Sequence, residues 1–343
     1  MSDGVKGVAK RARSAVTKTL LSDIYFILDE LNGKIDASEK VLSGMQLKIN
    51  HEQTELLREI HSLAKNSGVL PLSEKEVVSK IFSGLKMYLD PRDIAVVPHL
   101  VLDGIWEHRI TAAWQKVVKK NDVVLDVGAN FGYYGVLAAQ QTSKKESKIV
   151  MFEANPHLIP YIKKTLAVNW LNEQCVVENL AISDKKGEVT LNLLKDYVGS
   201  SSLQTTEQLN SYMREKMYLE TEEKIKVKSV SIDEYCKNNK IEQVDLVKMD
   251  IEGYEEIAYE GMRDTVKTSP NMTFFIEFTK DGYEHPEKFY NKMLNDFGNV
   301  YTIDDDGNFV VPKDSSYSSV IGDADDWVMP VFSKNSRLAV NKE

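Results

Sequence analysis

Five carboxylates follow apolar stretches that read as buried strands, and they are the residues of this sequence best placed to do chemistry. They are Asp126, Glu153, Asp250, Glu252 and Glu277. Ligands of an open α/β sheet bind beyond the carboxyl ends of its strands, so the fold would gather these side chains along one rim. Converging carboxylates repel one another unless they bind something. This rim is therefore the predicted site of binding and catalysis.

The stretch 123–134 carries the clearest local signal, because an apolar strand, a tight turn and a helix follow one another in it. Gly128 and Gly132 leave room for a ligand to approach backbone N–H groups at the start of the helix. Asn130 stands where the dinucleotide fingerprint has its second glycine, which favours a nucleoside cofactor without phosphates over NAD. A plain packing turn is the alternative interpretation.

A second strand-like stretch, 148–153, ends in Glu153. An acid at the tip of the second strand of a βαβ unit can accept hydrogen bonds from both hydroxyls of a ribose. Asn155 could fix the loop near that ribose, or it could cap the helix that we expect to begin around Pro156. Together with the glycine turn, these residues predict a site for a nucleoside cofactor such as S-adenosylmethionine.

Three segments together resemble the FkbM family of S-adenosylmethionine-dependent methyltransferases. They are DVGANFGYY at 126–134, FEANP at 152–156 and LVKMDIEGYE at 246–255, of which the third is the most specific to the family. The similarity runs from about Ile81 to Ser333. It implies an α/β fold of the Rossmann-like class I methyltransferase type, with a mostly parallel seven-stranded sheet and helices on both faces. It also implies methyl transfer to an oxygen, usually a hydroxyl of a sugar or a sugar-like ring.

The resemblance implies that the cofactor contacts lie in the turns after the first two strands and at the exit of the third. The predicted contacts are Asp126, Gly128, Ala129, Asn130, Gly132, Glu153, Ala154, Asn155 and Ala181. Ala181 is the expected contact to the adenine. Trp106 and Glu107 precede the first strand and could line the same cleft, or they could be a core tryptophan beside a helix-capping acid.

An alcohol must lose its proton as it attacks the methyl group, and a positioned base assists this. Asp250 and Glu252 are the first candidates for that base. Strand alternation puts Lys248 on the same side as Asp250, where it could hold the carboxylate ionised; the alternative is an ion pair that only steadies the end of the strand. A divalent metal held by Asp250 with Glu252 or Glu277 could act in place of the base, but these carboxylates alone do not establish a metal site.

The predicted substrate contacts are Glu277, His285, Ser200 and Ser201. Residues 184–240 are longer than a crossover helix requires, and an insertion at the rim of such a sheet is well placed to recognise a substrate. The two serines could hydrogen-bond sugar hydroxyls, although a run of serines after glycine is also typical of a flexible loop. His285 is a further possible base, although a lone histidine in such a loop is more often a surface residue.

Composition indicates a cytoplasmic protein. The 343 residues carry a net charge of -9, which argues against a general nucleic-acid binder. The two cysteines are too few for a disulfide framework and fit a reducing compartment. The sequence has no apolar run long enough to span a membrane and no secretory signal.

From Leu21 to Leu63, apolar residues recur at every seventh position, which predicts a long helix that self-associates as a coiled coil. A helix packed against its own catalytic domain is the alternative. Residues 1–18 are basic and could contact the inner face of an anionic membrane, although a solvated end is the default expectation.

The predicted organisation has four parts: a basic N-terminus with a coiled-coil helix at 1–66, a linker at 67–80, the methyltransferase domain at 81–333 and a tail at 334–343. We expect a homo-oligomeric O-methyltransferase whose acceptor is a sugar or glycan, for example the terminal sugar of a surface polysaccharide. A coiled-coil scaffold with an inactive methyltransferase-like domain is the main alternative. A dehydrogenase that uses NAD is disfavoured by Asn130.

Overall fold

The computed structural model describes residues 68–144, 147–194, 197–202, 221–279, 283–322, 327–334 and 338. The predicted coiled-coil helix and basic segment at 1–66, and most of the tail at 334–343, lie outside these residues. No helix in the described part of the chain combines the length and the apolarity that a membrane span requires.

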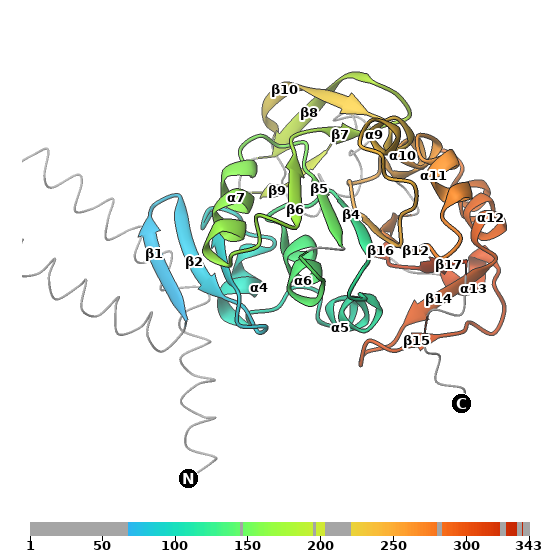
Figure 1. Ribbon diagram of the computed structural model, residues 1–343, viewed down its shortest axis with the longest axis horizontal. Coiled ribbons are helices and arrows are strands. Elements are labelled where there is room, and N and C mark those ends of the chain that lie inside the picture. Colours follow the sequence, from blue (N-terminus) through green and yellow to red (C-terminus); the bar gives the residue numbers. More distant parts are fainter. Residues whose placement is uncertain are drawn as a thin grey trace, which may run out of the picture.

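An eight-stranded sheet forms the centre of the protein, with the strand order β15-β14-β17-β12-β11-β4-β5-β6 (Figure 1). Its strands are β4 (Val123–Val127), β5 (Lys148–Phe152), β6 (Cys175–Glu178), β11 (Leu246–Met249), β12 (Thr273–Ile276), β14 (Asn299–Ile303), β15 (Phe309–Val310) and β17 (Val331–Ser333). The five strands from β12 to β6 are parallel, and β17 runs antiparallel to both of its neighbours. The predicted class I methyltransferase fold is confirmed, and the two-residue β15 adds a short hairpin to its seven strands.

The strands are almost continuously apolar because helices cover both faces of the sheet. Neighbouring residues alternate between the two cores, so that Phe275 packs in one and Phe274 in the other. Figure 1 shows α5 and α6 on one side of the sheet and α9, α10 and α11 on the other. The helices are α5 (His108–Val117), α6 (Tyr133–Gln141), α7 (Ile159–Val168), α9 (Ile232–Asn238), α10 (Glu255–Glu260), α11 (Arg263–Thr268) and α12 (Pro286–Phe297). Asp126 and Lys248 interrupt the apolar pattern and lie opposite each other in the register of β4 and β11.

The insertion after β6 forms a second sheet with the order β7-β10-β8-β9. Its strands are β7 (Ala181–Ile182), β8 (Gly187–Leu194), β9 (Tyr197–Ser202) and β10 (Thr221–Val230). Ser200 and Ser201, which we expected in a loop, lie in β9, which pairs antiparallel with β8. The hydrogen bonds between paired strands use backbone groups only, so a run of serines can form a strand when a strand with alternating apolar residues, such as β8, lies beside it.

The stretch 67–80, which we expected to be a linker, instead contains two strands of a three-stranded antiparallel sheet. The strands are β1 (Val69–Ser73), β2 (Glu76–Lys80) and β3 (Lys86–Leu89). Val77 and Ser79 on β2 are buried, and the Ser79 hydroxyl donates to the carbonyl oxygen of Leu100 in α4 (Val97–Leu102) at 2.9 Å. This sheet is therefore packed onto the unit that is built around the central sheet.

The segment 327–333 forms two separate short strands. β16 (Trp327–Val328) pairs with β13 (Phe278–Thr279), whereas β17 belongs to the central sheet. Pro330 lies between β16 and β17 and has no N–H group to donate to a ladder, which accounts for the break. The short α13 (Tyr317–Val320) precedes this segment.

Candidate active site

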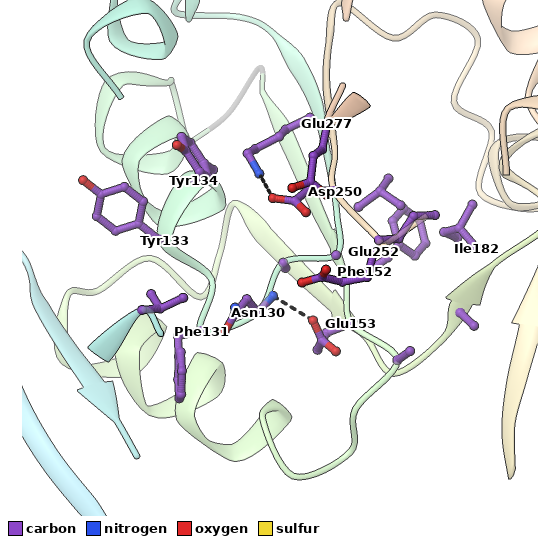
Figure 2. A pocket seen from close by; sticks show the side chains of 18 of the residues that line it. Asn130, Phe131, Tyr133, Tyr134, Phe152, Glu153, Ile182, Asp250, Glu252 and Glu277 are labelled. Atoms are coloured by element: carbon purple, nitrogen blue, oxygen red, sulfur yellow. Dashed lines mark hydrogen bonds and ion pairs between the residues drawn. The ribbon is translucent and has the colours of Figure 1, made fainter. Parts of the chain in front are cut away.

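A cavity lies at the carboxyl ends of β4, β5, β11 and β12 (Figure 2). The predicted site residues that line it are Gly128, Ala129, Asn130, Glu153, Ala154, Ala181, Lys248, Asp250, Glu252 and Glu277. Four other predicted residues, Asp126, Gly132, Asn155 and His285, are not part of its wall. The structure describes the backbone but not the side chains of Ser200 and Ser201.

The glycine turn after β4 lies against the end of β11. Gly128 has φ +80°, and a Cβ at this position would overlap the carbonyl oxygen of Asp250. The N–H groups of Gly128 and Ala129 both donate to the carbonyl oxygen of Phe152 at 3.0 Å. These two donors therefore join β4 to β5, whereas the sequence had suggested that they face a ligand.

Glu153 is buried beside this turn, and both of its carboxylate oxygens accept backbone hydrogen bonds. Its Oε2 accepts from the Asn130 N–H and its Oε1 from the Asn155 N–H, each at 2.7 Å. Burial raises the pKa of Glu153 to about 7, although these two hydrogen bonds oppose the shift. The Asn155 Oδ1 in turn accepts from the His157 N–H at 3.0 Å, so Asn155 shapes the chain ahead of α7.

Asn130 offers an acceptor in the cavity wall. Its backbone is left-handed, with φ 54°. Within the described residues its buried Oδ1 has no hydrogen-bond partner. Buried polar atoms in native proteins are nearly always paired, so an orphan acceptor in a cavity fits a ligand that brings a hydroxyl or amino hydrogen.

Asp126 and Gly132 act behind the cavity wall, at the start of α6. Asp126 is buried, and its Oδ2 accepts from the Gly135 N–H at 2.7 Å. Burial raises the pKa of Asp126 to about 6, while Lys248 and this hydrogen bond oppose the shift. Gly132 is the N-terminal cap of α6, with φ +84°. These two residues therefore orient the helix that follows the turn.

Lys248 is a buried cation at the centre of the acidic part of the cavity. Its Nζ lies 2.7 Å from the Asp250 Oδ2 and 4.5 Å from the centroid of the Tyr134 ring. Burial alone would lower the pKa of Lys248, but Asp250 and Glu107 outweigh it and raise the pKa above its ordinary value. Lys248 is therefore charged at any physiological pH, and the ion pair expected from strand alternation is present.

Two further acids in the wall have raised pKa values. Burial raises the pKa of Glu277 well above its ordinary value, and the charges of Asp250 and Glu252 add to the effect. Burial also raises the pKa of Glu107, which accepts a hydrogen bond from the Tyr134 hydroxyl at 2.6 Å. Both shifts favour the neutral acid, which can donate a hydrogen bond to a ligand.

Three of the five non-glycine residues with positive φ in the described part of the chain belong to the cavity wall. Glu107, Asn130 and Glu252 have φ values of 44°, 54° and 57°. Such left-handed backbone is disfavoured for residues with a Cβ and persists where the surrounding structure enforces it, often at functional sites. All three residues were named from the sequence, but nothing in the sequence indicated their conformation.

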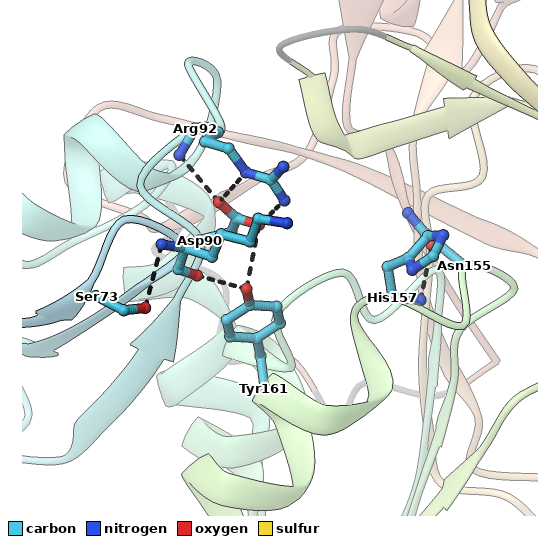
Figure 3. A network of polar contacts seen from close by, with 7 residues as sticks. Ser73, Asp90, Arg92, Asn155, His157 and Tyr161 are labelled. Atoms are coloured by element: carbon cyan, nitrogen blue, oxygen red, sulfur yellow. Dashed lines mark hydrogen bonds and ion pairs between the residues drawn. The ribbon is translucent and has the colours of Figure 1, made fainter. Parts of the chain in front are cut away.

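A network of polar contacts fixes the loop after β3, which leads to the wall residue Ala95. The Arg92 guanidinium pairs with the Asp90 carboxylate, with Nη2 2.6 Å from Oδ2, and the Tyr161 hydroxyl donates to the same oxygen at 3.1 Å (Figure 3). The Tyr161 ring packs edge-on against Phe131, a residue of the cavity wall, at 5.8 Å between centroids. The loop after β3 is thereby joined to α7 and to the glycine turn.

The sequence missed several wall residues, and one of the four predicted residues outside the wall lies in a separate groove. Trp106 and Glu107 line the cavity, as one of the two interpretations of that segment held. Tyr134 follows the glycine turn directly and could have been found from its place in the motif, whereas Trp327 comes from a segment without any motif. His285 is exposed at the start of α12 and lines a separate surface groove.

In the described part of the chain, no three His, Cys, Asp or Glu side chains are grouped as a metal site would require.

The chain matches a family model and is similar to several solved structures. The family model described as the methyltransferase FkbM domain matches residues 126–309. Solved structures similar to the chain include the methyltransferase FkbM from Methylobacillus flagellatus KT, at 12% identity and a TM-score of 0.38. The similarity covers 69% of this chain and 52% of that one. The chain thus spans about half the length of that relative.

Two other solved structures are TYW2 of P. horikoshii in complex with MeSAdo and Trm5 of Methanocaldococcus jannaschii in complex with adenosine. The first has 13% identity and a TM-score of 0.40, and it covers 81% of this chain and 83% of that one. The second has 14% identity and a TM-score of 0.38, and the similarity covers 80% of this chain and 57% of that one. No curated protein matches the chain. Since the family model covers more than half of the 343 residues and includes all three motifs, the chain belongs to the methyltransferase FkbM domain family.

Proposed function

We propose that this protein transfers a methyl group from S-adenosylmethionine to a hydroxyl oxygen of a sugar or glycan. One observation carries the proposal: a single cavity joins a nucleoside-type half to an acidic half. The first half contains the Gly128 turn and Glu153, and the second contains the Lys248–Asp250 ion pair. A methyltransferase needs such neighbouring halves, because the methyl donor and the acceptor oxygen must meet in one line.

The nucleoside half suits the cofactor in both shape and chemistry. Phe152, Leu180, Ala181 and Ile182 supply an apolar surface against which an adenine would pack. Each carboxylate oxygen of Glu153 accepts one backbone N–H and has a second lone pair, with which it would accept a hydrogen bond from a ribose hydroxyl. When bound, S-adenosylmethionine supplies an electrophilic methyl group on a sulfonium.

The acidic half supports attack by a hydroxyl group. Asp250, held by Lys248, would take the proton of the acceptor hydroxyl, and Glu252 is the other candidate for this role. The raised pKa of Glu277 favours its neutral form, which would donate a hydrogen bond that orients the acceptor. Each of these residues belongs to the chain itself and lines the same cavity.

The proposal extends to the setting of the enzyme. The heptad pattern of 21–63 supports self-association, and the basic segment 1–18 supports work close to a membrane. A terminal sugar of a growing surface polysaccharide would be a suitable acceptor there. A divalent metal at the carboxylates remains an optional part of the proposal, tested by adding a chelator to the assay.

A screen of acceptors tests the proposed substrate class. Free sugars, nucleotide sugars and oligosaccharides would be offered with S-adenosylmethionine, and release of S-adenosylhomocysteine would be followed. We expect release that depends on a free sugar hydroxyl. Turnover only with amine, thiol or carboxylate acceptors that carry no sugar would contradict the proposal.

The affinity for S-adenosylmethionine should increase with pH because of Glu153. Only the carboxylate can accept hydrogen bonds from both ribose hydroxyls, and burial raises the pKa of Glu153 to about 7. Acidification therefore protonates the group and weakens binding. A group with this pKa is roughly 10% ionised at about pH 6 and roughly 90% at about pH 8, so binding should be about tenfold weaker at the lower pH. Calorimetric titration at both pH values measures the difference.

Glu153→Gln is the matched control, because it keeps the shape of the side chain and does not ionise. We expect weaker binding by this variant and no change in affinity between the two pH values. A wild-type affinity that is the same at both pH values would contradict the assignment of Glu153.

A further inference from the structure

The loop that carries Asp250 and Glu252 has an unfavourable backbone. Glu252 and Gly253 follow one another in the left-handed region, with φ 57° and 89°. For Glu252 this conformation is disfavoured by its Cβ, so contacts from outside the loop must hold it. The Asp250 N–H donates to the Val127 carbonyl at 3.0 Å and fixes the first residue of the loop to β4.

The fully buried Glu255 holds Ile251, the second residue of this loop. Glu255 occupies the first position of α10, and its Oε1 accepts the Ile251 N–H at 2.8 Å. Its side chain does not line the cavity, whereas Ile251 and Glu252 do. Glu255 therefore acts on the cavity wall from behind.

The other carboxylate oxygen of Glu255 reaches a second wall segment. The Tyr283 hydroxyl lies 3.0 Å from the Glu255 Oε2 and 3.0 Å from the carbonyl oxygen of Glu277. Ring contacts with Phe278 at 4.8 Å and Phe289 at 5.2 Å hold Tyr283 in place. The bridge thus runs from Ile251 to Glu277, and Figure 2 shows that Asp250, which precedes Ile251, lies next to Glu277.

We infer that Glu255 is a positioning residue that, together with Tyr283, sets the position of the Asp250–Glu252 loop relative to Glu277. The consequence for catalysis rests on the proposed function, whereas the claim that the bridge holds the loop in place does not. The bridge connects the candidate base to the acid that would orient the acceptor, so it controls the geometry in which an acceptor hydroxyl is held.

The hydrogen bonds of the bridge are consistent with a neutral Glu255. Burial raises the pKa of Glu255 to about 7, and the titratable groups facing it are Asp250, Glu277 and Tyr283. A protonated Oε2 can donate to the Tyr283 oxygen, and the phenol can then donate to the Glu277 carbonyl. Both contacts of Tyr283 are satisfied in this way with its single proton.

Glu255→Gln is therefore a close mimic of the native bridge. Its amide oxygen can accept the Ile251 N–H, and its amide nitrogen can donate to the Tyr283 oxygen. Glu255→Ala removes both contacts. Tyr283→Phe keeps the ring contacts and removes only the hydroxyl, so it breaks the link to Glu277 and leaves the hold on Ile251.

Residue-level hydrogen exchange on the full chain tests the bridge without any ligand. In Glu255→Ala we expect the Ile251 amide to exchange about tenfold faster or more, while the Leu125 amide in β4 keeps its wild-type rate. Glu255→Gln should restore the protection of Ile251. The inference fails if Ile251 exchanges at the wild-type rate in Glu255→Ala, if Ile251 and Leu125 lose protection equally, or if Glu255→Gln behaves like Glu255→Ala.

A second measurement separates this inference from the proposed function. S-adenosylmethionine is titrated into the wild type and each variant, and methyl transfer is followed with the acceptor found by the screen. We expect Glu255→Ala to lower kcat about a hundredfold, the scale for a misplaced group, and to change the KM for S-adenosylmethionine by less than about threefold. Absence of cofactor binding by the wild type would reject the proposed function, while the exchange rates would still decide the role of Glu255. Equal kcat values for the wild type and Glu255→Ala would overturn the catalytic consequence.

Discussion

An Asp250→Asn variant is expected to fold, to bind S-adenosylmethionine and to transfer methyl groups about a hundredfold more slowly than the wild type, or slower still. Asp250 lines the cavity beside Glu277 and Glu252, and its Oδ2 lies 2.7 Å from the Lys248 Nζ. An amide has nearly the same shape as the carboxylate but cannot take the proton of an acceptor hydroxyl. The buried Lys248 also loses its counter-charge, which disturbs the acidic half further.

Release of S-adenosylhomocysteine with a saturating acceptor measures this rate. Glu242→Gln, at an exposed position before β11, is the control and should keep the wild-type rate. Glu252→Gln in the same assay separates the two candidate bases, because the larger loss identifies the group that takes the proton. A wild-type rate in Asp250→Asn would remove Asp250 from the mechanism.

A Gly128→Ala variant is expected to lose about 3 kcal/mol of unfolding free energy, from the sum of backbone strain and steric overlap. Gly128 has φ +80°, which disfavours any residue with a Cβ, and the added Cβ would overlap the Asp250 carbonyl oxygen. A backbone oxygen cannot rotate away as the end of a side chain can, so β4 and β11 would have to move apart. Urea unfolding of the full chain, followed by near-UV circular dichroism, measures the loss.

Gly84→Ala separates the two contributions. Gly84 has φ +87°, but among the described residues no atom beyond Gly84 and its two chain neighbours lies within 4 Å of the position of an added Cβ. Only the strain applies there, so we expect a loss of about 1 kcal/mol. Equal losses in the two variants would show that the close approach of the glycine turn to Asp250 does not matter for stability.

The sequence predicted the central sheet because its strands are buried on both faces. Predominantly apolar runs such as 123–127 and 148–152 are recognisable without knowledge of their neighbours. The rim of carboxylates followed from the rule that parallel strands end at one edge. Glu153, Asp250 and Glu277, which come from three different strand ends, do meet in one cavity.

The sequence could not predict features that depend on distant partners. β1 and β2 were taken for a linker because 66–68 and Pro71 are residues typical of one. The burial of Ser79 depends on its contact with Leu100 of α4, which lies 21 residues away in the sequence. The link between Tyr134 and Glu107 likewise joins residues 27 positions apart. Such contacts leave no periodic signal in the sequence.

Asp126 shows how a motif residue can have another role. The family resemblance placed it among the cofactor contacts, but its carboxylate accepts the Gly135 N–H and lies outside the cavity wall. Strand alternation does not distinguish a residue that faces a ligand from one that caps the next helix. The same limit applies to Asn155, whose side chain accepts from the His157 N–H.

Calorimetric titration of S-adenosylmethionine into the wild type and Glu153→Ala tests the central claim most directly. Circular dichroism would first establish that both proteins are folded. We expect micromolar binding by the wild type and a loss of about 1 to 3 kcal/mol in the variant, the scale of a lost hydrogen bond to a charged group. This corresponds to a dissociation constant roughly 5- to 150-fold higher. No heat of binding and no thermal shift with the wild type would contradict the claim and favour a scaffold with an inactive methyltransferase-like domain.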